Sequence, residues 1–116
     1  MRNHLLKYFS DILCAISEIE SFLTIKGRRF DVFISDMMFY KSILMNIAII
    51  GEAMNNILKI QPDIEISNAR KIVDTRNYVI HGYDSLSPEI LWNIVINHLP
   101  NLKIEIEKIK SNISII

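Results

Sequence analysis

Hydrophobic residues recur every three or four positions through the first part of the chain, which is the period of one face of an α-helix. This stripe consists of Leu5, Phe9, Ile12, Ile16, Ile19 and Leu23. Gly27, Arg28 and Arg29 then interrupt the pattern. The spacing predicts a first amphipathic helix that ends near Gly27.

A second and more apolar stretch, from about Asp31 to Ile60, shows the same helical spacing. Its periodic positions are Phe33, Met37, Tyr40, Leu44, Ile47, Ile50, Met54, Ile57 and Leu58. Pro62 and Asp63 should end the helix, because proline cannot continue the helical hydrogen bonding. We therefore predict one long second helix over 31–60. A third, shorter helix should begin after Ser67 as N-cap and end at Gly82.

A strong start signal for a fourth helix stands at Ser87, Pro88 and Glu89: serine caps free amides, proline is tolerated in the first turn, and an acid suits the positive helix end. Its apolar stripe is Ile90, Ile94, Leu99, Leu102, Ile106 and Ile109. Pro100 interrupts the stripe, so the helix should kink or split near His98.

Four helices with short linkers, and no convincing strand alternation, predict an all-α fold: an antiparallel four-helix bundle with a kinked last helix, in one domain over 1–116. Some apolar faces are wider than one bundle core requires. Met37, Met38, Phe39 and Tyr40 stand together in one such place. We expect a homodimer that shares part of this surface.

The composition narrows the functional classes. Half of the 116 residues are hydrophobic, and 13 basic residues balance 13 acidic ones. This excludes a protein that wraps nucleic acid by overall charge, so any RNA contact must be local. The one cysteine, Cys14, is interpreted as a small apolar filler; it forms no internal disulfide and suits the cytoplasm. No secretion signal or membrane span is apparent, because the longest apolar run, Ile47–Ile50, is short.

The candidate chemistry lies at the end of the third predicted helix, where Arg76, Asn77, His81 and Tyr83 stand within one and a half turns. Asn77 can hydrogen-bond the His81 imidazole from one turn away and fix its tautomer. An imidazole can move a proton near neutral pH, and a guanidinium can hold a phosphate. RNA would supply its own 2'-hydroxyl nucleophile. However, Arg76 and His81 lie about 140° apart on an ideal helix, so they converge only if the helix end unwinds.

Spacing alone also allows a purely structural explanation, in which Arg76 pairs with an acid and His81 offsets the helix dipole. Glu52 is such an acid, in an otherwise apolar stretch. It is either buried and tied to Arg76 or a tyrosine, or it lines a cleft and positions Arg76. The histidines His4 and His98 lack partners at metal-ligand spacing, and we predict no metal site.

The ordered motifs extend this picture. Arg76, His81 and Tyr83 stand as R-x4-H-x-Y, with Asn77 directly after the arginine. Together with I-G-E-A at 50–53 and L-P-N-L at 99–102, this set resembles the HEPN superfamily, and within it the HepT-like toxins of the MntA-HepT toxin-antitoxin type. The resemblance covers nearly the whole chain. One departure is Ala69, where relatives commonly carry tryptophan.

The resemblance implies a dimeric HEPN bundle whose two R-x4-H motifs face each other across a cleft and cleave cellular RNA, such as transfer or messenger RNA, without a metal or cofactor. His81 would be the general acid/base, Arg76 the phosphate ligand and Asn77 the orienting residue. Across the dimer, Arg76 of one chain could serve His81 of the other. Tyr83 would accept AMP from the antitoxin, a partner nucleotidyltransferase of the MNT type, and this modification would inactivate the toxin.

Two other functions stay open. A non-catalytic HEPN module could bind a nucleotide or dock the nucleotidyltransferase, and a plain structural bundle would do neither. The presence of Arg76, Asn77, His81 and Tyr83 together favours the enzyme over the docking module. The resemblance over nearly the whole chain disfavours the plain bundle. RNA binding would need a local positive patch, for which the candidates are Arg28, Arg29, Arg70, Lys71 and Arg76.

Overall fold

The structure is a computed structural model that describes residues 2–81 and 87–115; the side chains of 2, 3, 78, 80, 81, 114 and 115 are not described. The described elements, in chain order, are α1 (Arg2–Lys26), α2 (Phe30–Ser35), α3 (Met37–Ile60), α4 (Ala69–His81), α5 (Pro88–Asn93), the π-helical turn η2 (Ile94–His98) and α6 (Leu99–Ile115). No strand occurs in these ranges. The predicted all-α class is therefore confirmed.

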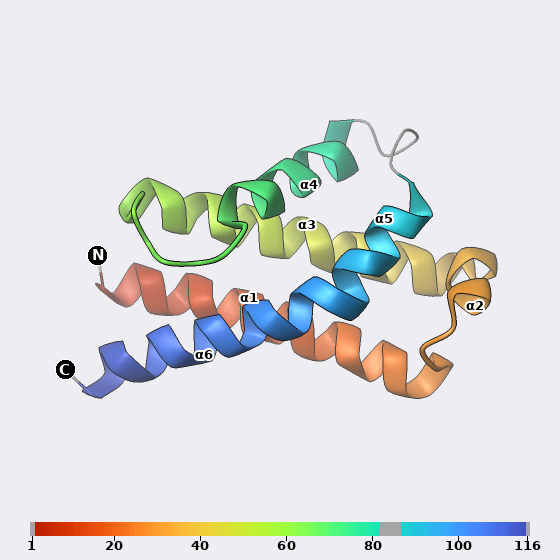
Figure 1. Ribbon diagram of the computed structural model, residues 1–116, viewed down its shortest axis with the longest axis horizontal. Coiled ribbons are helices and arrows are strands. Elements are labelled where there is room, and N and C mark those ends of the chain that lie inside the picture. Colours follow the sequence, from red (N-terminus) through yellow and green to blue (C-terminus); the bar gives the residue numbers. More distant parts are fainter. Residues whose placement is uncertain (1, 82–86, 116) are drawn as a thin grey trace.

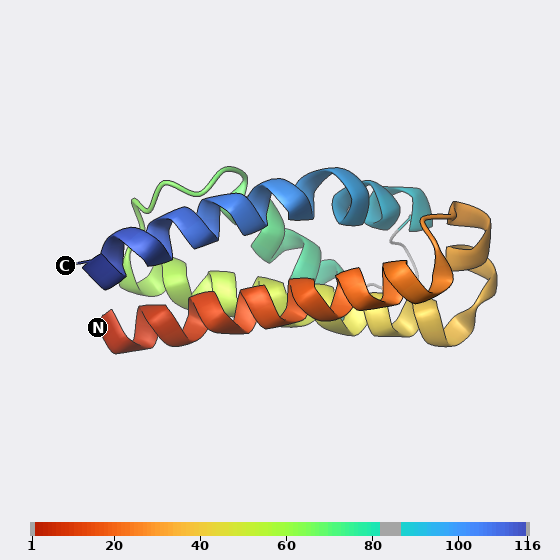
Figure 2. The ribbon, with the colours of Figure 1, turned by 90° about the horizontal axis from the view of Figure 1, so that it is seen from below.

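Successive long helices run in alternating directions along a molecule of 46 × 29 × 19 Å (Figure 1). The start of α1 and the end of α6 lie at the same end of the molecule in both views (Figures 1 and 2). α3 is central, because α1 and α4 both pack extensively against it. α4 is the short helix of the set, and its main packing partner is α3.

The core follows from the helical periodicity. Every residue of the predicted α1 stripe is buried. The buried residues of that stripe are Leu5, Phe9, Ile12, Ile16, Ile19 and Leu23. α1 ends at Gly27, which adopts a left-handed backbone (φ 85°) that glycine accepts without strain, and its amide donates to the Leu23 carbonyl at 2.8 Å.

The prediction of one continuous helix over 31–60 is wrong, because the chain breaks at Asp36 between α2 and α3. Asp36 has an extended backbone, and its carboxylate accepts the Phe39 amide at 3.1 Å as the N-cap of α3. The break folds α2 back so that Phe33, fully buried, contacts the rings of Phe39 and Trp92 at centroid distances of 5.6 and 5.0 Å. These three aromatic rings thereby pack α2 and the start of α3 against α5.

α4 begins at Ala69, so Ser67 is not its N-cap as predicted. Asn68 precedes the helix with a left-handed backbone (φ 61°), which asparagine adopts more readily than most residues. The Ser67 amide instead donates to the Glu105 carboxylate of α6 at 3.0 Å. The link between α3 and α4 is therefore anchored to the last helix. The predicted helix end at Gly82 lies outside the described residues.

The fourth helical segment starts as predicted: the Ser87 hydroxyl accepts the Glu89 amide at 3.2 Å, and Pro88 occupies the first turn. The predicted irregularity near His98 is also present, as the π-helical turn η2 immediately before Pro100. There the Leu99 amide donates to the Ile94 carbonyl, five residues back. Pro100 has no amide hydrogen, so it cannot donate to the carbonyl four residues back.

Several apolar residues that periodicity or composition assigned to the interior are exposed. Cys14 is exposed on α1, so its interpretation as a buried filler is wrong. Met37 and Ile90, assigned to apolar stripes, are also exposed. α3 is long and apolar enough to cross a membrane by length and composition alone, but half of its apolar window is buried inside the protein. Core helices of soluble proteins commonly have this composition.

Candidate active site around Arg76

The Arg76 side chain is held between two helices. Its terminal nitrogen NH2 donates to the Glu52 carboxylate of α3 at 2.5 Å, and NH1 donates to the Asn77 side-chain oxygen at 2.7 Å. Arg76 is 23% exposed and Glu52 is 52% exposed. The guanidinium is thus fixed in direction at the molecular surface by two polar partners.

Gly51 makes this arrangement possible. A Cβ at this position would lie 2.1 Å from the Arg76 Cβ and 3.1 Å from the Ile72 carbonyl oxygen. No side chain fits between α3 and α4 at this point, so the two helices approach until Arg76 rests on the Gly51 backbone. Glu52 is the next residue along α3, and the close approach brings its carboxylate within reach of Arg76. The I-G-E sequence therefore combines a packing residue with a positioning residue.

The hydrogens of the guanidinium are only partly used. Each terminal nitrogen of Arg76 carries two hydrogens, and each gives one to its partner described above. Nε is buried and has no hydrogen-bond partner within residues 2–81 and 87–115. The remaining hydrogens on NH1 and NH2 are chemically suited to the oxygens of a phosphate.

The predicted site residues are placed to different extents. Arg76, Asn77 and Glu52 come together, and Glu52 pairs with Arg76. Of the two alternatives for Glu52, the one in which it is buried is wrong. The Asn77 oxygen contacts Arg76. The predicted contact between Asn77 and the His81 imidazole lies outside the described residues, since His81 is described only in its backbone at the end of α4. Tyr83 is outside them altogether.

A comparison with known protein families places the whole chain. A family model described as "Ribonuclease HepT-like" matches residues 12–109, which include both Glu52 and Arg76. The chain belongs to the HepT-like ribonuclease family. The resemblance inferred from the motifs is therefore confirmed at the level of this family.

Individual relatives of this HepT-like chain agree. It is 31% identical over 110 residues to a protein of Methanocaldococcus jannaschii that is provisionally named as an RNase, covering 91% of this chain and 87% of the relative. It is 31% identical over 107 residues to a protein of Thermococcus cleftensis provisionally named ribonuclease HepT, covering 89% and 93%. A provisionally named RNase of Caldanaerobacter subterraneus is 26% identical over 86 residues, covering 73% and 77%. No solved structure matches the chain significantly.

The five positive residues proposed as a local RNA-binding patch of this HepT-like chain lie in two separate places. Arg70, Lys71 and Arg76 lie on α4, whereas Arg28 and Arg29 lie in the connection between α1 and α2. Figure 1 shows that connection on the side of the molecule away from α4. Arg29 is also paired with Asp31 at 2.7 Å. Only the α4 group can act with the Arg76 site within one chain. Among the described residues, no group of three or more His, Cys, Asp or Glu side chains could hold a metal ion.

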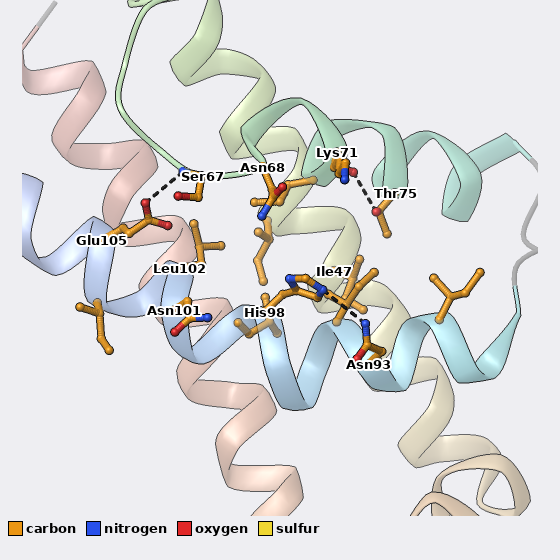
Figure 3. A pocket seen from close by; sticks show the side chains of 16 residues that line it. Ile47, Ser67, Asn68, Lys71, Thr75, Asn93, His98, Asn101, Leu102 and Glu105 are labelled. Atoms are coloured by element: carbon orange, nitrogen blue, oxygen red, sulfur yellow. Dashed lines mark hydrogen bonds between the residues drawn. The ribbon is translucent and has the colours of Figure 1, made fainter.

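A cavity of about 570 Å³ lies between α4 on one side and η2 and the start of α6 on the other (Figure 3). Its walls come from α3, α4, α5, η2 and α6 and are mostly apolar. The lining includes Lys71 and Thr75 from α4 and Asn93 and His98 from the other side. From the sequence, His98 lacked a partner at metal-ligand spacing, and Asn93 was not a candidate residue. Their separation of five residues matches no α-helical face, so only the π-helical turn reveals the pair.

Proposed function

We propose that this HepT-like ribonuclease is a metal-independent endoribonuclease that acts as the toxin of a toxin-antitoxin pair in the cytoplasm. The observation that carries the proposal is the fixed Arg76 guanidinium at the start of the R-x4-H-x-Y motif, held by Glu52 and Asn77 with hydrogens left for a phosphate. The family supports ribonuclease chemistry.

The proposed reaction needs only the RNA and the motif. His81 removes the proton of the 2'-hydroxyl, whose oxygen bonds to the adjacent phosphorus as the bond to the 5'-oxygen breaks. His81 then gives this proton to the leaving 5'-oxygen, so the products are a 2',3'-cyclic phosphate and a 5'-hydroxyl. Arg76 stabilises the charge that develops on the phosphate oxygens. Asn77 and Glu52 position Arg76 throughout.

A second copy of the chain would complete this site. An exposed stripe on α3 consists of Met38, Met45, Ile49 and Glu52, which lie within about 60° of one another around the helix. Met38 is 81% exposed. Burying this stripe against its symmetry copy would place two Glu52–Arg76 pairs at one interface. Arg76 of one protomer could then act with His81 of its partner, which removes the difficulty of their separation on one helix.

Control of the toxin is proposed to occur at Tyr83. Its phenolic oxygen would attack the α-phosphorus of ATP in the active site of an MNT-type nucleotidyltransferase, forming a Tyr83–AMP ester and releasing pyrophosphate. The added phosphate would compete for Arg76 and block RNA. This step also accounts for a tyrosine two residues after the motif histidine.

The test is cleavage of total RNA and transfer RNA by purified protein in EDTA. Wild type should cleave, while Arg76→Ala and His81→Ala, and wild type pretreated with the cognate nucleotidyltransferase and ATP, should not. Mass spectrometry of the treated protein should show AMP on Tyr83. If unmodified wild type, verified by mass, cleaves no RNA, the ribonuclease proposal fails, and a non-catalytic nucleotide-binding or docking module replaces it.

A further inference from the structure

The cavity beside α4 has a polar side that the proposed reaction does not use. His98 and Asn93 face Lys71 and Thr75 across it (Figure 3). The walls between them are aliphatic and include Ile50, in the core of α3. A concave site of this size, mostly apolar with a few convergent polar groups, is typical of small-molecule and cofactor sites.

The π-helical turn builds the polar side. In a regular α-helix, residues five apart point in different directions, but the wider turn of η2 brings Asn93 and His98 together, with Asn93 Nδ2 and His98 Nε2 3.3 Å apart. Asn97 Nδ2 donates to Asn93 Oδ1 at 2.6 Å. Because Asn93 Oδ1 is the acceptor in that bond, Nδ2 donates to His98 Nε2. The neutral imidazole then carries its hydrogen on Nδ1, and no described residue accepts it.

The charged residues around the cavity indicate how a ligand would be oriented in it. Lys71 pairs with no carboxylate among the described residues. Glu105 lies at the other end, where it accepts the Ser67 amide (Figure 3). An anionic group therefore belongs at the Lys71 end, and the neutral part of a ligand belongs against the aliphatic walls and the amide–imidazole pair.

We propose that this cavity binds one nucleoside phosphate, with the base between the aliphatic walls and His98 and the phosphate at Lys71. A flat base suits the apolar walls, its ring nitrogens and carbonyls suit the His98 Nδ1–H donor, and its phosphate suits an unpaired ammonium. A purely apolar peptide side chain would leave these polar groups without partners. The ligand chemistry is that of a nucleotide, either free or within an RNA strand.

The cavity is connected to the proposed active site through α4. Lys71, Ile72 and Thr75 line it, and Arg76 follows Thr75 directly. The RNA arm of this inference rests on the proposed ribonuclease function: a nucleotide held here would fix the strand beside the Arg76 guanidinium. The cavity would then determine where along the strand the enzyme cuts.

The experiment measures binding of a fluorescent single-stranded oligo(A) ribonucleotide by anisotropy, in a His81→Ala background that prevents cleavage, with AMP as competitor. His98→Ala should weaken binding about tenfold. Thr75→Trp, which fills the cavity, should abolish the cavity's contribution. Lys71→Ala should lower the slope of log affinity against log salt by about one, whereas Lys108→Ala, an exposed lysine on α6 outside the cavity, should change it less.

Competition by AMP would show that the cavity accepts a free nucleotide. If the variants weaken oligo(A) binding but AMP does not compete, the cavity binds a nucleotide only within an RNA strand. The proposal would be overturned if folded His98→Ala and Thr75→Trp bound the oligonucleotide and AMP as wild type does. It would also be overturned if these variants lost only the binding of the nucleotidyltransferase, since the cavity would then be a protein contact. Failure of the cavity proposal can be distinguished from failure of the ribonuclease proposal. If RNA cleavage depends on Arg76 but is unaffected by His98→Ala and Thr75→Trp, the ribonuclease proposal stands and the cavity proposal fails. If the protein binds AMP in the cavity but cleaves no RNA, the cavity proposal stands and the ribonuclease proposal fails.

Discussion

Gly51 and Arg76 are in backbone-to-side-chain contact, so close that a Cβ on Gly51 would lie 2.1 Å from the Arg76 Cβ. The packing of α4 on α3 and the position of the guanidinium are therefore one feature. Any change in the separation of these helices moves Arg76 relative to Glu52. Stability and activity should respond together to substitutions at this contact.

Gly51→Ala tests this relationship. The added methyl cannot fit without moving α4, so the free energy of unfolding should fall by about 1–3 kcal/mol, despite the better helix propensity of alanine. RNA cleavage should fall as well, because Arg76 loses its position against Glu52. Urea unfolding and cleavage rates measure the two effects.

A double-mutant cycle provides the control. Arg76→Gly costs about 1 kcal/mol in helix propensity and removes the Cβ that Gly51→Ala meets. In the Arg76→Gly background, Gly51→Ala should therefore be much less destabilising than in wild type. Equal destabilisation in both backgrounds would show that the contact with Arg76 is not what excludes a side chain at position 51.

Glu52→Gln tests positioning rather than packing. Glu52 is half exposed, and exposed ion pairs contribute little to stability, so the free energy of unfolding should change by less than about 1 kcal/mol. Cleavage should nevertheless fall about tenfold or more, because a neutral amide holds the guanidinium less firmly. Glu107→Gln, on the exposed face of α6, is the matched control. An active Glu52→Gln enzyme would remove Glu52 from the site.

The sequence predicted those features that depend on local periodicity and caps. The α1 stripe and the Ser87 cap belong to this class, because residues three and four apart share a helix face in any context. The break at Asp36 was missed since the helical spacing of apolar residues continues across it, although an aspartate cap was available. The Glu52–Arg76 pair spans 24 residues, so the sequence left open whether Glu52 pairs with Arg76 or with a tyrosine, and whether it is buried. Pro100 indicated an irregular helix, but not that Asn93 and His98 would meet.

The stability of the α2–α3 corner should depend on pH through Asp36. A hydrogen bond from Lys26, and a second from the Phe39 amide, hold the Asp36 pKa below its usual value. Because the folded pKa is lower than the unfolded one, near 3.9, this stabilisation is present above that pH and is lost as the pH falls through the folded pKa. Urea midpoints of wild type and Asp36→Asn should thus differ at pH 7 and should converge only well below about pH 3.9, as the pH falls through the folded pKa. Asp63→Asn, in the exposed loop after α3, is the matched control, and its urea midpoint at pH 7 should stay close to that of wild type.

Met45→Lys tests whether the α3 stripe carries a dimer. Met45 is 64% exposed and lies between Met38 and Ile49 on the stripe, so a lysine there should not unfold the monomer. In a symmetric interface each substitution occurs twice near the axis, and the like charges should dissociate the dimer. Light scattering should report a monomer, and cleavage should fall with it, because each site would lose the partner's His81. The control is Ile25→Lys: Ile25 is an apolar residue near the end of α1 that is even more exposed than Met45, and the substitution should leave both the dimer and cleavage unchanged. A Met45→Lys protein that remains dimeric would place the interface elsewhere, and a fully active monomer would mean that one chain holds the whole site.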